Sequence, residues 1–450
     1  MSRPLAAIIL AAGKGTRMKS DLHKVLHPIA GRPMIEHLLE SVDELGPTQT
    51  VVVVGSGREQ VEPVVAGHGG VVVVQEPQRG TAHAVIQAET ALAGFDGAVL
   101  ILYADTPFVT VETMRRMLSR LDGADEPAAV VVASRPDDPK HYGRILADPD
   151  GTILKMVEYQ DASDEERALD LCNSGLMAVR SSDLWPMLAR VGNANKAGEY
   201  YLPDIVMIAA SDGRKSAAIE VAAEEVEGIN SRGELAAREA AWQARRRAEA
   251  MAGGASLIAP ETIWFAFDTR VGRDVVIEPN VFFGPGVSIA DGARIRAFSH
   301  IAGARIGPGA EIGPFARLRP GTEIGANARI GNFVETKKAK LGAGAKANHL
   351  TYLGDAEVGA GANIGAGTIT CNYDGFFKYG TVIGEGAFIG SNTALVAPVS
   401  IGAGAIVGAG SVVTRDVEGD ALAVARGVQE VKPGWARRFR ALMSAKKKAG

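Results

Sequence analysis

The chain has 450 residues, of which 46% are apolar and 22% are charged, and its formal net charge is -4. This composition is typical of a soluble globular protein, and the length predicts two or three domains. The near-neutral charge does not favour a nucleic-acid partner. A short basic run at the C-terminal end, Arg437 to Lys448, is expected to be a solvated tail.

Cysteine usage and hydropathy favour a cytoplasmic location. The two cysteines, Cys172 and Cys371, fall in different predicted domains, so they indicate neither a disulfide framework nor a metal cluster. The early apolar run Leu5 to Ala12 breaks at Gly13, which is too short for a signal peptide. Every apolar run is far shorter than the roughly 20 residues of a membrane helix, so no membrane partner is expected.

Short β-rich runs alternate with helical patterns in the first half of the chain. The expected strands are 6–10, 50–54, 70–74, 98–103 and 128–133, and the expected helices include 34–45, 82–93 and 111–121. Such alternation predicts βαβ units and a Rossmann-like α/β domain with a mostly parallel sheet. An Ala/Arg/Glu-rich segment, 234–251, predicts a connector helix. We expect domains at 1–232 and 255–450, joined by a connector at 233–254.

Aliphatic residues recur every six positions after residue 255, commonly with Gly next in line. The two clearest series are Ile306, Ile312, Leu318, Ile324 and Ile330, and then Ile383, Ile389, Leu395, Ile401 and Val407. A helix would require a 3.6-residue period, whereas six residues suit a short strand and a turn. Stacked coils of this kind bury a continuous apolar column. The run 372–381 does not fit the period and predicts a projecting loop, where repeat proteins tend to carry function.

This repeat resembles that of the hexapeptide acyltransferases. The resemblance implies a C-terminal left-handed parallel β-helix and assembly as a homotrimer. A zinc enzyme of the γ-carbonic anhydrase type is an alternative for such a fold, but it takes three histidine ligands, and this domain offers only His300 and His349.

A Gly-rich string follows the first expected strand, Leu10-Ala11-Ala12-Gly13-Lys14-Gly15-Thr16-Arg17, and Lys24 comes shortly after it. Its glycines let backbone N–H groups approach a triphosphate, and Arg17 and Lys24 can neutralise charge that develops there. The string is neither a Walker A loop nor a dinucleotide fingerprint. Alone, it is equally consistent with a simple strand-to-helix turn.

Further segments, in order and spacing, resemble the sugar-1-phosphate nucleotidyltransferases. They are Gln75 with 80–84, 102–105, 142–144, 157–158, 173–175 and 228–230. Over nearly its full length the chain is similar to the bacterial bifunctional N-acetylglucosamine-1-phosphate uridyltransferase/glucosamine-1-phosphate N-acetyltransferase family. The resemblance implies synthesis of UDP-N-acetylglucosamine for cell-wall biogenesis, in the order acetylation and then uridylyl transfer.

The resemblance also implies roles for residues of the first domain. The UTP and UDP-sugar site would comprise Leu10, Ala11, Gly13, Lys24, Gln75, Gly80, Thr81, Tyr103, Asp105, Gly143, Glu158, Asn173 and Asn230, with Asp105 and Asn230 binding Mg²⁺. Lys24 and Arg17 would act in catalysis. Two residues depart from the family pattern: His23 replaces a proline, and Ala104 replaces a glycine. We expect His23 to loosen the Lys24 loop and Ala104 to narrow the floor of the site.

Acetyl transfer to an amine requires a general base, and His349 is the natural candidate, because histidine is the side chain most often used in that role. A lone histidine is more often structural, but cationic side chains surround this one in the sequence. The resemblance places the sugar phosphate at Arg319, Lys337, Tyr352, Asn363 and Lys378, and acetyl-CoA at Ala366, Asn372, Tyr373, Ser391, Ala409 and Arg426. The segment from Arg426 to Arg440 is a candidate to close the acetyl-CoA site of an adjacent chain.

Two other readings stay open on sequence alone. The β-helix could be only a trimerising scaffold on a monofunctional nucleotidyltransferase, or a structural solenoid fused to a nucleotide-binding module. The set His349, 372–378 and Ser391 favours the bifunctional enzyme, because a bare scaffold needs none of these side chains.

Overall fold

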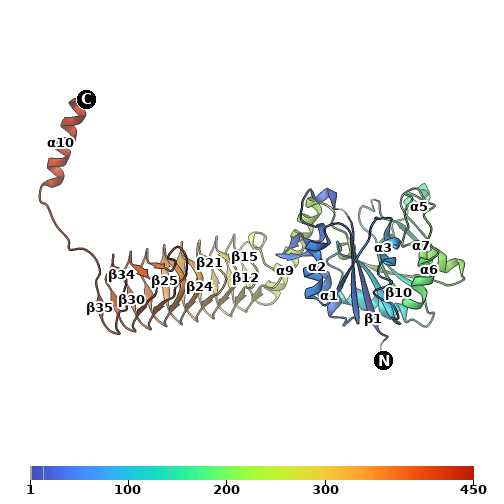
Figure 1. Ribbon diagram of the computed structural model, residues 1–450, viewed down its shortest axis with the longest axis horizontal. Helices are drawn as coiled ribbons and strands as arrows, with labels where there is room; N and C mark the ends of the chain where they lie inside the picture. The colour runs from blue at the N-terminus through green and yellow to red at the C-terminus, as the bar shows by residue number, and fades with distance from the viewer. Residues whose placement is uncertain (1–2, 14, 140, 450) are drawn as a thin grey trace. The chain divides into compact units, whose positions relative to one another are not determined.

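The computed structural model describes residues 3–13, 15–139 and 141–449 (Figure 1). It divides into two compact units, Met1–Trp242 and Gln243–Gly450. The first is an α/β unit and the second is a parallel β-helix, so the predicted fold classes are confirmed. Helix α9 (Arg232–Ala252) occupies the predicted connector and contains the division between the units. The domain limits proposed from the sequence stay a prediction.

A mostly parallel sheet forms the centre of the first unit, in the order β11-β7-β10-β6-β1-β4-β5. Strand β1 pairs in parallel with β4 and β6, whereas β10 is antiparallel to β6 and β7. The register places Leu10 beside Tyr103. The strands are β1 (Leu5–Ala11), β2 (Pro28–Ile29), β3 (Arg32–Pro33), β4 (Gln49–Val54), β5 (Val71–Val74), β6 (Ala98–Tyr103), β7 (Ala129–Ser134), β8 (Arg144–Ala147), β9 (Ile153–Val157), β10 (Cys172–Arg180) and β11 (Ala217–Val221).

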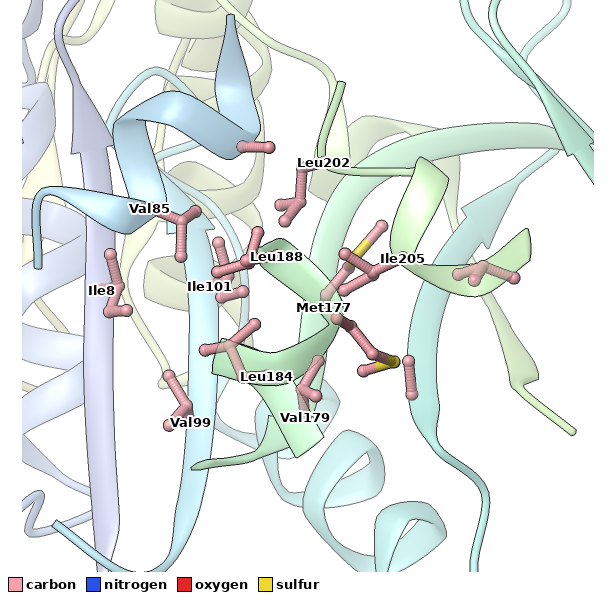
Figure 2. Packing of buried hydrophobic residues seen from close by; sticks show 14 of the residues in the cluster. Ile8, Val85, Val99, Ile101, Met177, Val179, Leu184, Leu188, Leu202 and Ile205 are labelled. Atoms are coloured by element: carbon pink, nitrogen blue, oxygen red, sulfur yellow. The ribbon is translucent and has the colours of Figure 1, made fainter. Parts of the chain in front are cut away.

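Apolar side chains from both faces of this sheet pack against helices, as all-buried strands require. On one face, Ile8, Val99 and Ile101 of the strands meet Val85, Leu184 and Leu188 of α3 and α6 (Figure 2). The helices are α1 (Met34–Asp43), α2 (Arg58–Gly67), α3 (Thr81–Ile86), α4 (Val111–Leu121), α5 (Asp164–Arg167), α6 (Ser181–Leu188), α7 (Asp204–Ser211) and α8 (Ala223–Val226), with 3₁₀ turns η1 (Thr16–Met18) and η2 (Lys24–Leu26).

The α3 helix is shorter than the sequence predicts. It ends at Ile86 instead of residue 93, and the chain continues as turns. There the N–H groups of Ala88 and Glu89 bond to carbonyls three residues back, the 3₁₀ pattern in place of the α pattern.

Strands of two to seven residues build the second unit. They are β12 (Ser256–Leu257), β13 (Arg270–Val271), β14 (Val276–Ile277), β15 (Phe282–Phe283), β16 (Ser288–Ile289), β17 (Arg294–Ile295), β18 (His300–Ile301), β19 (Ala304–Ile306), β20 (Glu311–Ile312), β21 (Arg317–Leu318), β22 (Thr322–Ile324), β23 (Arg329–Asn332), β24 (Glu335–Leu341), β25 (Lys346–His349), β26 (Tyr352–Val358), β27 (Asn363–Ile364), β28 (Ile369–Cys371), β29 (Thr381–Ile383), β30 (Phe388–Ile389), β31 (Ala394–Val396), β32 (Val399–Ile401), β33 (Ile406–Val407), β34 (Val412–Val413) and β35 (Leu422–Ala423), with η3 (Pro260–Thr262) and a terminal helix α10 (Trp435–Ala449).

The predicted six-residue repeat is the period of this β-helix. Ile306, Ile324 and Leu341 stand in register on successive coils and are buried. Glycine follows each aliphatic position because the coils approach closely there: a Cβ on Gly307 would lie 2.7 Å from the carbonyl oxygen of Ile324. The left-handed β-helix expected from the hexapeptide repeat therefore rests on side-chain stacking and turn packing.

Among the described residues, the helices are too short or too polar to cross a lipid bilayer.

Candidate active sites

A pocket opens at the carboxyl end of β1, where ligands usually bind in open α/β sheets. Its lining brings together most of the predicted nucleotide-site residues: Leu10, Ala11, Gly13, Lys24, Gln75, Gly80, Thr81, Tyr103, Asp105 and Asn230, together with Ala12, Val25, Pro77, Gln78, Ala84 and Glu199. These residues come from six separate segments of the chain. The strand order therefore assembles the site that the sequence motifs indicate.

Three polar side chains meet on one side of this pocket. Lys24 Nζ lies 2.5 Å from Asp105 Oδ2 and 3.0 Å from Asn230 Oδ1. A backbone hydrogen bond holds Asp105 and Asn230 close together, because the Ile229 N–H donates to the Asp105 carbonyl at 2.9 Å. Carboxylate and amide oxygens suit Mg²⁺, which commonly takes one or two protein ligands and completes its shell with substrate phosphates and water.

Another side of the pocket is built on the loop before α3. Gln75 Nε2 donates to the Gly80 carbonyl at 2.9 Å, and Gln78 Nε2 donates to the Ala12 carbonyl. Gly80 adopts φ +113°, and a Cβ there would lie 2.4 Å from the Tyr200 carbonyl oxygen. Only glycine fits this close approach. Thr81 Oγ1 accepts from the Leu202 N–H at 2.9 Å, which fixes the start of the helix.

Three of the predicted sugar-site residues, Gly143, Glu158 and Asn173, do not line this pocket, whereas Tyr103 does. Asn173 is buried, and its N–H donates to the Gly143 carbonyl at 2.9 Å. A Cβ on Gly143 would lie 3.4 Å from Glu158 Oε2. Burial raises the pKa of Tyr103 well above its usual value, and the carboxylates of Glu158 and Asp105 add to it. Burial likewise raises the pKa of Glu158, with Asp204 contributing.

Arg17 lines an adjoining pocket instead of the first one. That pocket contains Tyr142, Glu234 and Arg238, and it shares Asn230 with the nucleotide pocket. Arg17 therefore does not line the pocket that contains Lys24 and Asp105. Lys14, which belongs to the same sequence string, lies outside the described residues.

Ala104 and His23 are the two residues that depart from the family pattern, and each makes a hydrogen bond through its backbone N–H. Ala104 is fully buried, and its N–H donates to the Leu10 carbonyl at 3.0 Å. The His23 loop is held: the His23 N–H donates to Gln60 Oε1 at 2.9 Å. The loosening expected for this loop is therefore offset by a side-chain contact that proline, which has no N–H, could not make.

A cluster of cations marks the β-helix. Arg319 and Lys337 stand in register on successive coils, and Lys378 approaches Lys337 from the loop 372–380. The Lys378 ammonium lowers the pKa of Lys337, and desolvation and Arg319 add to that effect. Arg319 is partly balanced by Glu335 at 2.9 Å. Tyr352 pairs with Glu335 across the coils and lies in the same face. Like charges held together in this way suit a phosphate dianion.

Four of the predicted acetyltransferase residues form a single column. By the register of β25, β27, β30 and β33, His349, Ala366, Ser391 and Ala409 occupy the same position on successive coils. The column is hydrogen-bonded along its length, since the N–H groups of Gly367, Asn392 and Gly410 donate to the carbonyls of its first three members. Arg426 contacts its last member, because Arg426 Nη1 donates to the Ala409 carbonyl at 2.5 Å.

His349 is exposed and oriented. Its Nδ1 lies 2.9 Å from Asn332 Oδ1, on the coil before it. With Nδ1–H donating to that oxygen, Nε2 keeps its lone pair and faces away from the contact. This tautomer leaves an imidazole nitrogen able to accept a proton from a substrate.

The projecting loop predicted at 372–381 is confirmed. Residues 372–380 stand where the previous coil has Asp355 alone, and Asn372 Nδ2 donates to Asp355 Oδ2 at 2.6 Å. Tyr373 is exposed, and its hydroxyl donates to the Gly375 carbonyl. Asn363 lies on the coil after His349, in register with Lys346.

Family models match both the α/β unit and the β-helix. Residues 7–194 match the MobA-like NTP transferase domain, and 268–303, 303–338 and 380–415 match the bacterial transferase hexapeptide (six repeats). "Bifunctional protein GlmU" of Sphingopyxis alaskensis is 67% identical over 100% of this chain and 99% of its own length. The proteins of the same name from Rhizorhabdus wittichii and Novosphingobium aromaticivorans are 69% and 65% identical, each over 99% of both chains.

The chain belongs to the bifunctional GlmU family. The prediction of one enzyme that joins a nucleotidyltransferase domain to a hexapeptide transferase domain is confirmed. A solved structure of UDP-glucose pyrophosphorylase complexed with UDP-glucose covers 54% of the chain and 100% of its own length, at 20% identity and a TM-score of 0.43.

In this GlmU-family chain, sequence reasoning missed Gln78, Glu199, Asn332 and Gln60. Gln78 was within reach, since it lies inside the motif segment between Gln75 and Gly80. Glu199, Asn332 and Gln60 were missed because they contact residues from other segments of the chain, as Gln60 contacts residues 21–23. The spacing of residues in the sequence does not predict such contacts.

Proposed function

We propose that the β-helix transfers the acetyl group of acetyl-CoA to glucosamine 1-phosphate and that the α/β unit couples the product to UTP. The observation that carries the proposal is that one chain holds both an Asp105–Lys24–Asn230 centre in a pocket of the α/β unit and, on the β-helix, a His349 column and a cation cluster. Each set has the groups that one of the two reactions needs.

In the acetyl transfer, the sugar amine attacks the thioester carbonyl carbon, and coenzyme A leaves as its thiol. His349 Nε2 accepts the proton that the attacking amine loses, and Asn332 holds the imidazole in the required tautomer. Arg319, Lys337 and Lys378, with Tyr352, bind the phosphate of the sugar. Asn363, Asn372 and Tyr373 position the amino sugar and the acetyl group, and Ser391 contacts the thioester oxygen. Ala366, Ala409 and Arg426 hold coenzyme A.

In the uridylyl transfer, a phosphate oxygen of N-acetylglucosamine 1-phosphate attacks the α-phosphorus of UTP, and pyrophosphate leaves. Leu10, Ala11, Gly13, Gln75, Gly80 and Thr81 hold the uridine nucleotide, while Gly143, Glu158, Asn173 and Asn230 hold the sugar, with Tyr103 beside them. Lys24 and Arg17 neutralise charge on the phosphates, so catalysis is positioning and electrostatic stabilisation.

Asp105 and Asn230 would hold Mg²⁺, which would supply charge neutralisation on the triphosphate. The oxygen-only donor pair supports this choice.

The same proposal includes a cytoplasmic homotrimer. Hexapeptide repeats support the trimer, and the segment Arg426 to Arg440 is a candidate to reach the acetyl-CoA site of an adjacent chain. Sedimentation measurements would give the oligomeric state directly.

The test is a coupled assay with glucosamine 1-phosphate, acetyl-CoA, UTP and Mg²⁺, in which free thiol and pyrophosphate are followed separately. We expect both products, with thiol lost in His349→Ala and pyrophosphate lost in Asp105→Ala. If thiol never forms while supplied N-acetylglucosamine 1-phosphate still gives pyrophosphate, the β-helix is a scaffold and the acetyltransferase assignment is wrong.

A further inference from the structure

The loop that carries Lys24 is fastened to helix α2 by one side chain. Gln60 Oε1 accepts from the His23 N–H at 2.9 Å, and Gln60 Nε2 donates to the Asp21 carbonyl at 3.1 Å. Only one orientation of the amide satisfies both contacts, because one end must accept and the other must donate. Gln60 thus clamps the chain on both sides of Leu22.

The clamped segment has little else of its own to fix it. Asp21 and Leu22 are exposed, and residues 19–23 lie outside the helices and strands of the described chain. Exposed segments without regular structure open locally at low free-energy cost. The next residue, Lys24, is the one that enters the nucleotide pocket, so any movement at His23 moves the base of the Lys24 side chain.

The rest of the Lys24 side chain is closely fitted. A Cβ on Gly15, which has φ +59°, would lie 2.8 Å from Lys24 Cβ, so the lysine stem packs directly on that turn. At the other end, Nζ contacts Asp105 Oδ2 and Asn230 Oδ1. The backbone anchor at Gln60 completes a three-point support, in which each point fixes a different part of Lys24.

We propose that Gln60 is a positioning residue for uridylyl transfer: its amide clamps residues 21–23 so that the Lys24 ammonium is held where the triphosphate must bind. The role rests on the proposed function, in which Lys24 faces the phosphates. Gln60 lines neither the nucleotide pocket nor the adjoining one that contains Arg17. It acts on the reaction only through the loop, and misplacing a catalytic group by about 1 Å can cost 10²-fold in rate.

His23 offers a second way to hold the same loop. Its φ is -53°, inside the range that a proline ring imposes, and Leu26 N–H donates to its carbonyl at 2.9 Å. A proline at this position would restrict the turn covalently, but it would remove the N–H that Gln60 accepts. The hydrogen bonds of Gln60 and a proline at position 23 are therefore alternative ways to hold the loop. We expect the effects of Gln60→Met and His23→Pro on the rate to be non-additive.

The experiment compares Gln60→Met, His23→Pro, the double variant and Lys24→Ala in the full-length protein. Met keeps the length and helix propensity of Gln without its hydrogen bonds. We expect Gln60→Met to lower kcat for uridylyl transfer about tenfold, the range for one or two lost hydrogen bonds. The KM for N-acetylglucosamine 1-phosphate stays within about twofold, because the sugar side is untouched. Adding His23→Pro restores most of the lost rate.

Two controls make the result specific. Acetyl transfer by the same preparations reports the integrity of the β-helix, and Glu62→Gln, an exposed substitution on the same helix as Gln60, leaves both activities unchanged. Gln60→Glu is a second variant: it keeps an acceptor for the His23 N–H but cannot donate to the Asp21 carbonyl, so we expect an intermediate loss.

The positioning role is overturned if Gln60→Met keeps full uridylyl transfer, or if the losses of the two single variants simply add in the double variant. In either case, a loss of uridylyl transfer in Lys24→Ala would still support the proposed function. Uridylyl transfer that survives Lys24→Ala overturns the assignment of Lys24 and, with it, the role of Gln60.

Discussion

Lys24 Nζ lies 2.5 Å from Asp105 Oδ2, so a lysine ammonium holds the carboxylate that we assign to Mg²⁺. Both side chains are largely shielded, with 9% and 20% of their surfaces exposed, so neither charge is well screened by water. Binding of a metal and a triphosphate would exchange these partners, with Asp105 turning to the cation and Lys24 to the phosphates. In this pair the positive charge of Lys24 balances the negative charge of Asp105.

Replacing Asp105 with Asn keeps the size of the side chain and removes its charge. We expect uridylyl transfer to fall at least about 10²-fold, because the strongest ligand for Mg²⁺ is lost. Pyrophosphate release at increasing Mg²⁺ concentration measures the effect, and the residual rate should need more Mg²⁺ to saturate. Acetyl transfer, which has no use for the metal, should persist in this variant and in wild type treated with a chelator.

His349→Ala should lower acetyl transfer by about 10²- to 10⁴-fold, the usual contribution of a general base. Free thiol measures the loss, and pyrophosphate formation is the internal control. Asn332→Ala tests the tautomer separately: we expect a smaller fall in kcat with little change in the KM for acetyl-CoA. Unchanged acetyl transfer in both variants would remove His349 from the mechanism.

Glu158 predicts a pH dependence for the uridylyl transfer site. Its pKa is raised, first by burial and then by Asp204, so as the pH falls the carboxylate takes up a proton earlier than an ordinary glutamate. The neutral form is a weaker acceptor for sugar hydroxyls. The KM for N-acetylglucosamine 1-phosphate should therefore rise on the acid side, starting above the normal glutamate pKa. In Glu158→Gln the KM should be higher throughout and this acid limb should vanish.

Gly80→Ala tests the turn before α3. The new Cβ would meet the Tyr200 carbonyl oxygen, and φ +113° with ψ 174° is a conformation nearly restricted to glycine. We expect a loss of on the order of 1–3 kcal/mol in the free energy of unfolding of the α/β unit. Urea unfolding followed together with both activities would show it. Gly69→Ala, at a positive φ with open space around it, is the matched control for strain without collision.

Arg426→Ala should raise the KM for acetyl-CoA by about tenfold, since a charge-assisted contact is worth roughly twice a neutral one. A chain that ends after Glu418 should lose acetyl transfer more completely. Full acetyl transfer by that shortened chain would show that neither Arg426 nor the segment to Arg440 closes the site. Uridylyl transfer again reports whether the rest of the chain is folded.

The sequence predicted the β-helix well because its period is local: one aliphatic residue and one glycine recur within six positions. It could not place Ser391 above Ala366 by counting, since residues 372–380 interrupt the spacing between these coils. Only the register of β27 with β30 restores the column. The assignment of both residues to acetyl-CoA came from family resemblance and stays a prediction.

The nucleotide pocket shows the same division. Residues at strand ends, such as Leu10 and Tyr103, follow from the expected parallel sheet, which the register confirms. Asn230 contacts Lys24 although 206 residues separate them in the sequence, so no local pattern marks that contact. The same holds for Gln60, because its two hydrogen bonds go to backbone groups, which leave no pattern of side chains in the sequence.

The loop 372–380 leaves the β-helix after β28 and returns at β29, and both strands keep their pairing with β26. The coil is therefore completed whatever the loop contains, since its hydrogen bonds and buried aliphatic residues lie elsewhere. Lys378 and Tyr373 therefore lie on a loop whose sequence can change without disturbing the β-helix. A relative could acquire a different acceptor substrate by replacing this one stretch, while the scaffold beneath it stayed unaltered.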